Sequence, residues 1–316
     1  MILFDFFKCD QNELLSAFCS YFDLSVTDTK KYLNMCDWSN TNAVDVIKGL
    51  NIDLSKSESQ EVYCMGCHLT TTTQNGISQF RQSGVFNLAQ MLSQKNDLTC
   101  LLTNNRISID YDNKTIEVGG NTYTLDFDSG KCRLCLKGNN ETCGAFSNCK
   151  FKQKLQVLKV KLYVYSATTE FFISGTLDEM KQYSTVARYP EILHTLDELL
   201  YAINYEQPTS MATVWEKDHP ICVAIKFIVN ISDMETFNPM DWDAWFREYG
   251  ECILSCGFTS DDFYMGQIPK TVFDNFYIVN KFVSFYSFGN SEDYGSLLPA
   301  LYIHPSQIIA IDQIQL

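Results

Sequence analysis

The segment Val62–Thr72 reads VYCMGCHLTTT and contains no Asp, Glu, Lys or Arg. Its β-branched residues suit the pleated surface of a sheet, so we predict a β-strand. Because successive side chains of a strand point to opposite faces, the two faces would carry His68, Thr70 and Thr72, and Cys67, Leu69 and Thr71. An unpaired buried polar group costs about 1–3 kcal/mol, so the histidine face is either exposed to solvent or part of a site.

A metal knuckle is the alternative interpretation of this segment. Cys64 and Cys67 have Cys-x2-Cys spacing, and His68 follows them directly. No compact second pair of cysteines follows, since Cys100 is isolated, and the run is too β-branched for a ribbon turn. We therefore expect a strand here.

The rest of the chain after residue 60 is predicted to be an α+β domain. Residues 76–84 indicate a short helix between glycines, and residues 106–127 alternate polar and apolar residues as consecutive hairpins do. Residues 191–203 are amphipathic and predict a helix. Apolar runs of strand length cover residues 221–231, 277–286 and 301–311.

Residues 11–50 show three helical patterns separated by capping residues, such as Ser25, and followed by a polar linker. The segments 24–27 and 42–44, together with Trp38, resemble a ubiquitin-associated (UBA-like) fold over about 40 residues. This resemblance implies a three-helix module over residues 1–55 that binds a protein partner, followed by a second domain over residues 60–316. A generic helical adaptor is the alternative.

Composition indicates a folded chain: 46% of its 316 residues are hydrophobic and only seven are prolines. The net charge of −14 disfavours general affinity for nucleic acid or membranes. No stretch approaches the roughly 18 apolar residues of a membrane span, and the start MILFDFFKCD lacks a basic leading region. We therefore expect a cytoplasmic protein whose thirteen cysteines are thiols or metal ligands.

One basic segment departs from this acidic background. Residues 131–161 contain eight Lys and Arg residues and one acidic residue, which admits nucleic acid as a partner; lysines that only keep a loop soluble are the alternative. The same region holds four closely spaced thiols, Cys132, Cys135, Cys143 and Cys149. This spacing predicts a structural zinc site in an insertion over residues 131–154, with free thiols as the alternative.

The motif around His68 resembles the opening of ADP-ribosyltransferase-like toxins, particularly those that target nucleic acids. In that family His-x-Thr on the first strand precedes Gly-Ile, a Phe or Ile, and Gly on a helix; here these are His68 and Thr70, followed by Gly76-Ile77, Phe80 and Gly84. The match covers about 17 residues. It implies NAD as cosubstrate, with His68 orienting the nicotinamide ribose and Thr70 assisting, in an α+β fold with a mixed or antiparallel sheet.

The same family requires a carboxylate that stabilises positive charge on the ribose. The best candidate is Glu191, which follows Pro190 at a predicted helix start, with Arg188 available for a phosphate. Glu191 could instead only complement the helix dipole. The family's acid usually lies nearer the C-terminus, where Glu292 is the comparable residue.

These observations lead to two hypotheses of different classes. The first is a cytoplasmic, NAD-dependent ADP-ribosyltransferase-like effector, a toxin or antiviral (anti-phage) defence protein that modifies a nucleic acid or protein. The alternative is a non-catalytic two-module protein that recognises a nucleotide or a viral or partner protein.

Overall fold

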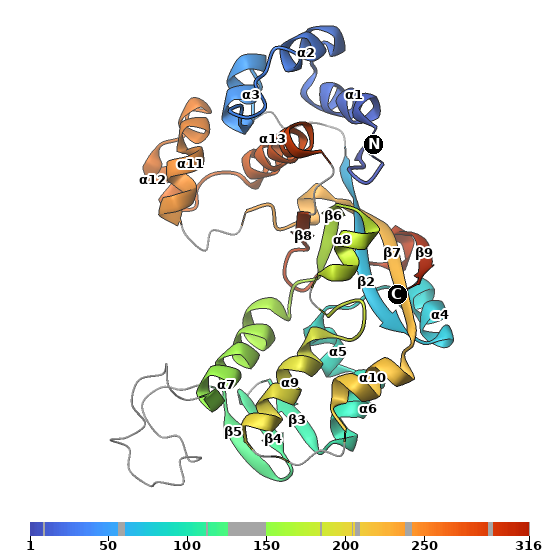
Figure 1. Cartoon of the computed structure of the whole chain (residues 1–316). Helices are drawn as coiled ribbons and strands as arrows, with labels where there is room; N and C mark the ends of the chain where they lie inside the picture. Colours follow the sequence, from blue (N-terminus) through green and yellow to red (C-terminus); the bar gives the residue numbers. More distant parts are fainter. Residues whose placement is uncertain are drawn as a thin grey trace.

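A mixed sheet runs through the middle of the molecule (Figure 1). The computed structural model describes residues 1–8, 10–55, 61–111, 113–125, 150–183, 185–203, 205, 209–237, 242–289 and 293–315. Within them the strand order is β8 (Asp293–Ser296), β6 (Glu170–Ser174), β2 (Val62–Thr72), β7 (Ile221–Asn230) and β9 (Ile308–Ile314). These neighbours are antiparallel, and β1 (Ile2–Phe4) adds to β2 in parallel. The predicted α+β class with a mixed, mostly antiparallel sheet is confirmed.

Strand β2 has the predicted bounds and lies at the centre of this sheet. It pairs continuously with β7, from Tyr63 opposite Asn230 to Thr72 opposite Ile221. Gly66 lies between two aromatic rings, because a Cβ atom there would be 2.6 Å from Phe227 and 2.9 Å from Phe171. The missing side chain thus lets large residues of both neighbouring strands meet over β2.

Helices from both ends of the chain cover the upper part of the sheet in Figure 1. They are α1 (Gln11–Phe22), α2 (Val26–Leu33), α3 (Ala43–Leu50), α11 (Trp242–Ser255), α12 (Ser260–Tyr264) and α13 (Lys270–Phe288). The first three begin as the capping pattern predicts, with the side chains of Asp10, Ser25 and Asn42 accepting backbone N–H bonds.

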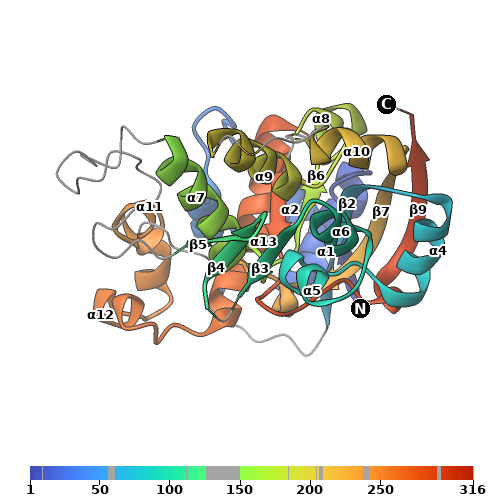
Figure 2. The same cartoon turned by 90° about the horizontal axis from the view of Figure 1, so that it is seen from below.

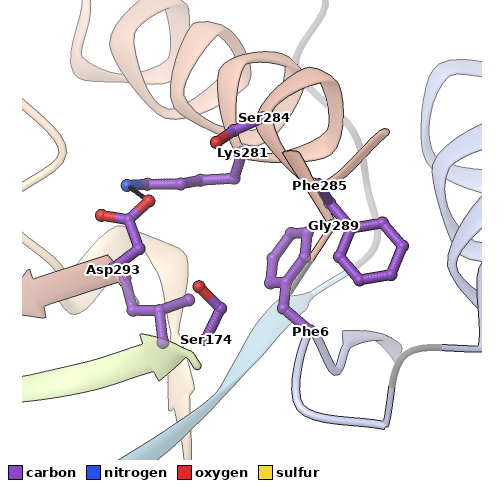
Figure 3. Close-up of a pocket in the computed structure, with 8 residues that line it drawn as sticks. Phe6, Ser174, Lys281, Ser284, Phe285, Gly289 and Asp293 are labelled. Atoms are coloured by element: carbon purple, nitrogen blue, oxygen red, sulfur yellow. Dashed lines mark hydrogen bonds and ion pairs between the residues drawn. The ribbon is translucent and has the colours of Figure 1, made fainter. Parts of the chain in front are cut away.

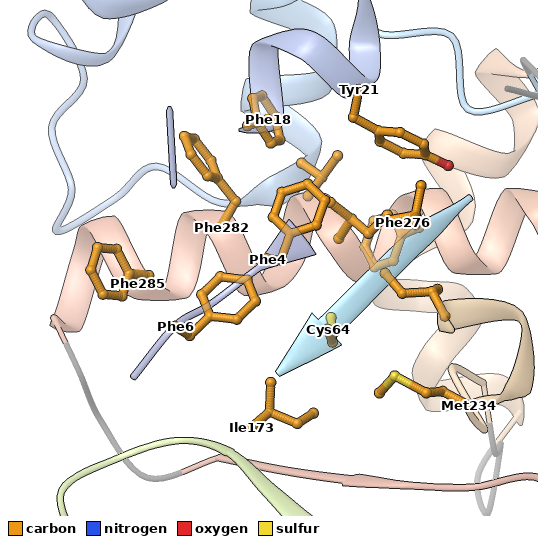
Figure 4. Packing of buried hydrophobic residues seen from close by; sticks show 14 of the residues in the cluster. Phe4, Phe6, Phe18, Tyr21, Cys64, Ile173, Met234, Phe276, Phe282 and Phe285 are labelled. Carbon is orange, nitrogen blue, oxygen red and sulfur yellow. The ribbon is translucent and has the colours of Figure 1, made fainter. Parts of the chain in front are cut away.

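The N-terminal helices share one hydrophobic core with α13 and the sheet (Figure 4). The rings of Phe18 and Phe282 stack with centroids 3.9 Å apart. The Tyr21 hydroxyl donates to the Asn275 side chain over 2.5 Å, and the Asn275 amide donates to the Leu54 carbonyl over 2.7 Å. The helices over residues 11–50 are as predicted, and their apolar faces are buried within the chain; their UBA-like identity stays a prediction.

A second hydrophobic core lies at the lower end of the molecule, which is seen from below in Figure 2. It is built by α5 (Leu88–Ser93), α6 (Asp97–Asn104), α7 (Lys150–Val160), α9 (Glu191–Ala202), α10 (Met211–Asp218) and a small sheet of β3 (Ile107–Asp110), β4 (Thr115–Val118) and β5 (Asn121–Thr124). The predicted hairpins and the helix from Glu191 are confirmed. At the second turn Gly119 and Gly120 adopt φ of 57° and 87°, which favours glycine.

One predicted strand is wrong. Residues 277–286 belong to helix α13, whose nineteen residues include Val272, Phe276, Val279 and Val283 on a buried stripe. A helix that is buried on several sides has few polar residues, so its sequence lacks the alternation of polar and apolar residues at helical spacing. A short apolar run from such a helix cannot then be distinguished from a buried strand. The run 301–311 also begins later than predicted, because Pro305–Gln307 form a 3-10 turn before β9.

Two further helices flank the sheet, α4 (Gln74–Ser83) and α8 (Leu177–Gln182). The first corresponds to the predicted helix at 76–84, capped by the Thr73 hydroxyl and ended by Gly84 with φ of 84°. Among the described residues, no helix is long and apolar enough to cross a membrane.

Candidate functional site

His68 lies in the middle of β2, half-buried and opposite Ile225 of β7. Its Nδ1 is 3.0 Å from the backbone carbonyl oxygen of Glu170, the first residue of β6. A carbonyl only accepts, so Nδ1 carries the proton and Nε2 has a free lone pair. Burial lowers the pKa of His68, and the hydrogen bond to Glu170 partly opposes this shift. The ring is therefore a neutral, oriented acceptor at neutral pH.

The predicted alternation along β2 is confirmed on both faces. Cys67 and Leu69 are buried with Phe172 on one face, where the Thr71 hydroxyl accepts a 2.9 Å bond from the indole of Trp215. His68 and Thr70 belong to the opposite face and are half-buried. The metal-knuckle alternative finds no support, since alternation separates Cys64 from Cys67 and burial raises the pKa of each thiol to about 12.

Helix α4 packs directly against the end of this strand. The backbone N–H of Gly76 donates to the Thr73 hydroxyl over 3.1 Å. A Cβ atom at Gly76 would lie 1.9 Å from the Thr72 hydroxyl oxygen, so glycine lets the helix begin this close to the strand without moving the Thr72 side chain. The glycine of the motif therefore has a steric reason.

Glu191 is the first residue of α9 and forms an ion pair with Lys161, the residue that directly follows α7. Its Oε2 is 2.7 Å from Nζ of Lys161. Lys161 begins a π-helical turn, Lys161–Tyr165, in which the Leu162 carbonyl accepts from the Tyr111 hydroxyl over 2.5 Å and also from the Ser166 hydroxyl. Such turns often occur at functional sites. Four residues separate this turn from β6, which begins at Glu170.

Glu170 connects the two predicted catalytic residues. Glu170 is exposed at the start of β6, yet partial desolvation of its carboxyl group raises the pKa of that group; the negative charge of Glu191 raises it further, whereas Lys161 lowers it. The Glu170 carbonyl meanwhile accepts from His68. Sequence reasoning missed this residue; a single carboxyl group opening the apolar run EFFIS is the signal that could have identified it.

The two groups reach Glu170 from different sides of the strand. Phe171 and Ile173 pack in the same core as Val62, the face of β2 that also carries His68. Alternation then places the Glu170 side chain with Phe172 on the other face. The imidazole thus approaches the main chain of β6 from one face of the sheet, whereas the Glu170 side chain lies on the other face.

The remaining predicted site residues either make no ion pair or lie outside the described residues. Arg188 is exposed in the turn before α9, and its guanidinium makes no ion pair with the part of the chain that the structure describes. Cys132, Cys135, Cys143, Cys149 and Glu292 lie outside the described residues. In residues 150–161, the described part of the basic segment, Lys154 pairs with Glu198 at 2.6 Å and Lys161 with Glu191, so α9 neutralises two of its charges.

A small pocket lies at the other end of β6, between that strand and α13 (Figure 3). Lys281 forms an ion pair with Asp293 there, and its Nζ is 5.1 Å from the ring centroid of Tyr277. Ser174 and Phe6 line the same pocket. The Tyr277 hydroxyl is buried without a hydrogen-bond partner among the described residues, and burial raises its pKa well above the ordinary value.

Comparison with known proteins returned no matching family model, no matching curated protein and no matching solved structure. Among the described residues there is also no group of three or more side chains arranged to hold a metal ion.

Proposed function

We propose that the chain is an NAD-dependent ADP-ribosyltransferase-like enzyme. The observation that carries this proposal is the fixed orientation of His68, whose Nδ1 is 3.0 Å from the Glu170 carbonyl oxygen and whose Nε2 is left available. His68 and Glu191, which the motif and the helix start single out, are 123 positions apart in sequence. His68 contacts the main chain of Glu170, and the charge of Glu191 acts on the Glu170 carboxyl group, which lies on the other face of the strand.

The proposed roles follow from the chemistry of the groups. The free Nε2 of His68 accepts a hydrogen bond from a ribose hydroxyl of NAD, and the Thr70 hydroxyl assists on the same face of β2. As nicotinamide leaves, the ribose develops positive charge, which a fixed carboxylate stabilises. Glu191 is the proposed carboxylate, and the ion pair with Lys161, 2.7 Å away, fixes its position. Arg188 would bind a phosphate of NAD.

The test is transfer of label from NAD to total cellular DNA, RNA or protein. Replacing His68 with Ala, or Glu191 with Gln, should each reduce transfer by about 100-fold while folding is retained. Glu198→Gln is the matched control, since Glu198 is on the same helix and pairs with Lys154 of α7 at 2.6 Å. His194→Ala controls for the histidine.

Two results would contradict the proposal. Absence of transfer from NAD to every fraction would favour the non-catalytic alternative, a protein that recognises a nucleotide or a partner protein. An equal loss in Glu198→Gln and Glu191→Gln would show that α7–α9 ion pairing supports the fold rather than the chemistry.

The wider setting is proposed on the same basis: a cytoplasmic toxin or antiviral defence effector whose N-terminal helices bind a protein partner. The spacing of Cys132, Cys135, Cys143 and Cys149 supports a structural zinc ion. Purified protein should then contain about one zinc equivalent, which Cys132→Ser removes and Cys100→Ser leaves. Fewer than about 0.5 equivalents in the unaltered protein would refute the site.

A further inference from the structure

A buried hydroxyl group next to the candidate site has no hydrogen-bond partner. Thr169 directly precedes β6 and is 3% exposed. Its Oγ1 is buried and makes no hydrogen bond with any of the described residues. Its backbone carbonyl, in contrast, is paired, since it accepts from the N–H of Leu297 over 3.0 Å. A buried hydroxyl without a partner is unfavourable, so the Thr169 side chain retains capacity for one polar contact from outside the chain.

Thr169 lies on the same face of the sheet as His68. Phe171 packs in the core on the His68 side of the sheet. Thr169 is two residues before Phe171 in an extended segment, so alternation places its side chain on that side as well. Leu297, which is paired with Thr169, is buried in the same core. The unpaired hydroxyl therefore belongs to the face of the sheet that carries the imidazole.

The strand register brings Thr169 level with Thr70. Strands β2 and β6 are antiparallel, and Cys67 lies opposite Phe172. Counting three residues along each strand from this pair reaches Thr70 on one strand and Thr169 on the other. His68, two residues before Thr70, still contacts the main chain of β6 at 3.0 Å, so the two segments remain adjacent at this point.

Three polar atoms on this face then lack a partner within the described part of the chain. They are Nε2 of His68, the Thr70 hydroxyl and the Thr169 hydroxyl. The Nε2 atom of a neutral imidazole only accepts, whereas a hydroxyl both donates and accepts. A phosphate oxygen without a proton could not donate to Nε2. Two neighbouring sugar hydroxyls satisfy all three atoms, since each of them donates and accepts.

A strained turn lies against the segment that contains Thr169. The N–H of Leu301 donates to the Leu298 carbonyl over 3.1 Å and closes the turn. Ala300, at its third position, has φ of 69°, a conformation that favours glycine. The Ala300 N–H donates to the Ala167 carbonyl over 2.9 Å, which holds the turn in place. Such strain concentrates at binding sites, and this turn is the neighbouring element that can move when a ligand reaches Thr169.

We propose that Thr169 is a further ligand-binding residue of the candidate site, and that its hydroxyl binds the ribose diol of the nicotinamide half of NAD together with His68 and Thr70. This rests on the proposed function, because NAD is the substrate proposed there. The contact is made in the bound substrate and in the transition state alike. It therefore lowers KM for NAD and leaves kcat unchanged.

Calorimetric titration of the full chain with nicotinamide mononucleotide, its 2′-deoxy and 3′-deoxy analogues, and nicotinamide tests the proposal. Thr169→Val should weaken binding of the mononucleotide about 10-fold, as expected for one hydrogen bond, whereas Thr169→Ser keeps the hydroxyl and should keep the affinity. For the deoxy analogue that lacks the contacted hydroxyl, Thr169→Val and wild type should bind equally.

Thr29→Val is the matched control, since Thr29 is a threonine of α2 that is 1% exposed and belongs to the N-terminal helices. It should leave the affinity for the mononucleotide unchanged. Thermal melting followed by circular dichroism verifies that each variant folds. In label transfer from NAD, Thr169→Val should raise KM about 10-fold at constant kcat.

The outcomes separate this proposal from the proposed function. If the mononucleotide binds in a Thr169-dependent way but no label is transferred from NAD, the ligand-binding role of Thr169 stands and the transferase fails. If label is transferred and Thr169→Val has the KM of wild type, the transferase stands and the role of Thr169 is overturned. Equal weakening of the mononucleotide and both deoxy analogues, the same Thr169 dependence for nicotinamide alone, or no binding of the mononucleotide to the unaltered chain would each overturn the diol contact.

Discussion

Replacing Gly66 with Ala should destabilise the protein strongly although it adds only one methyl group. The new Cβ would lie 2.6 Å from the Phe227 ring and 2.9 Å from Phe171, whereas carbon atoms pack at about 3.5–4.0 Å. Each ring would have to move by roughly 1 Å to restore that separation. Neither has room, because Phe227 is 0% and Phe171 2% exposed, and the rings pack edge to face 5.1 Å apart.

Overpacking of a filled core costs about 1–3 kcal/mol, and two confined rings place Gly66→Ala near 3 kcal/mol. Urea unfolding followed by tryptophan fluorescence measures this as a lower midpoint with an unchanged m-value. Phe227→Leu in the same background removes one of the two clashing rings. The double variant should therefore lose less stability than the sum of the two single variants, by about 1 kcal/mol or more.

Wild-type stability of Gly66→Ala would refute this reasoning, and so would strict additivity with Phe227→Leu. Either result would mean that the strand can shift to accept the methyl group. His68, two residues along β2, would then not be held rigidly by its neighbours.

Three further predictions concern single groups. Lys281→Met should lower the unfolding free energy by about 3 kcal/mol, because it leaves Asp293 without its partner in a largely buried pair; adding Asp293→Leu should recover most of the loss in urea unfolding, and no recovery would contradict the ion-pair argument. Thr169→Val removes the unpaired hydroxyl at nearly constant shape and should raise the melting temperature by an amount equivalent to up to about 1 kcal/mol, whereas Thr169→Ser should not; a fall would indicate that the hydroxyl has a partner. The pKa of Glu170 is raised in the folded state, so folding takes up protons there, and the free energy of unfolding falls as pH rises from the ordinary 4.5 through the folded value. Glu170→Gln should therefore be more stable than wild type at pH 7 and equally stable below pH 4.5. A constant difference in stability across that pH range would contradict the raised pKa.

The local structure of the chain could largely be predicted from sequence. Strand β2, the helices of residues 11–50 and the hairpins have short-range signals, such as β-branched runs, capping side chains and paired glycines. Helix α13 could not be recognised as one, because its burial against other helices removes the polar face that shows helical period.

The candidate site was predictable only in pieces. His68 and Glu191 stand out by motif and by position at a helix start. Their link through Glu170 depends on which residues of β2 and β6 lie opposite each other, and only Cys67 and Phe172 fix that register. The register between two strands about 100 residues apart cannot be predicted from the local sequence of either strand.

The parallel contact of β1 with β2 affects the order in which the chain can fold. The same sheet takes its strands from residues 2–4 at one extreme and 308–314 at the other, and helix α1 packs on α13, which is formed some 250 residues later. During synthesis the first helices must therefore wait for the last part of the chain before their apolar faces are covered. Until α13 has been made, the apolar faces of these first helices stay exposed to solvent and to other chains, which makes that period the one in which the chain is prone to aggregate.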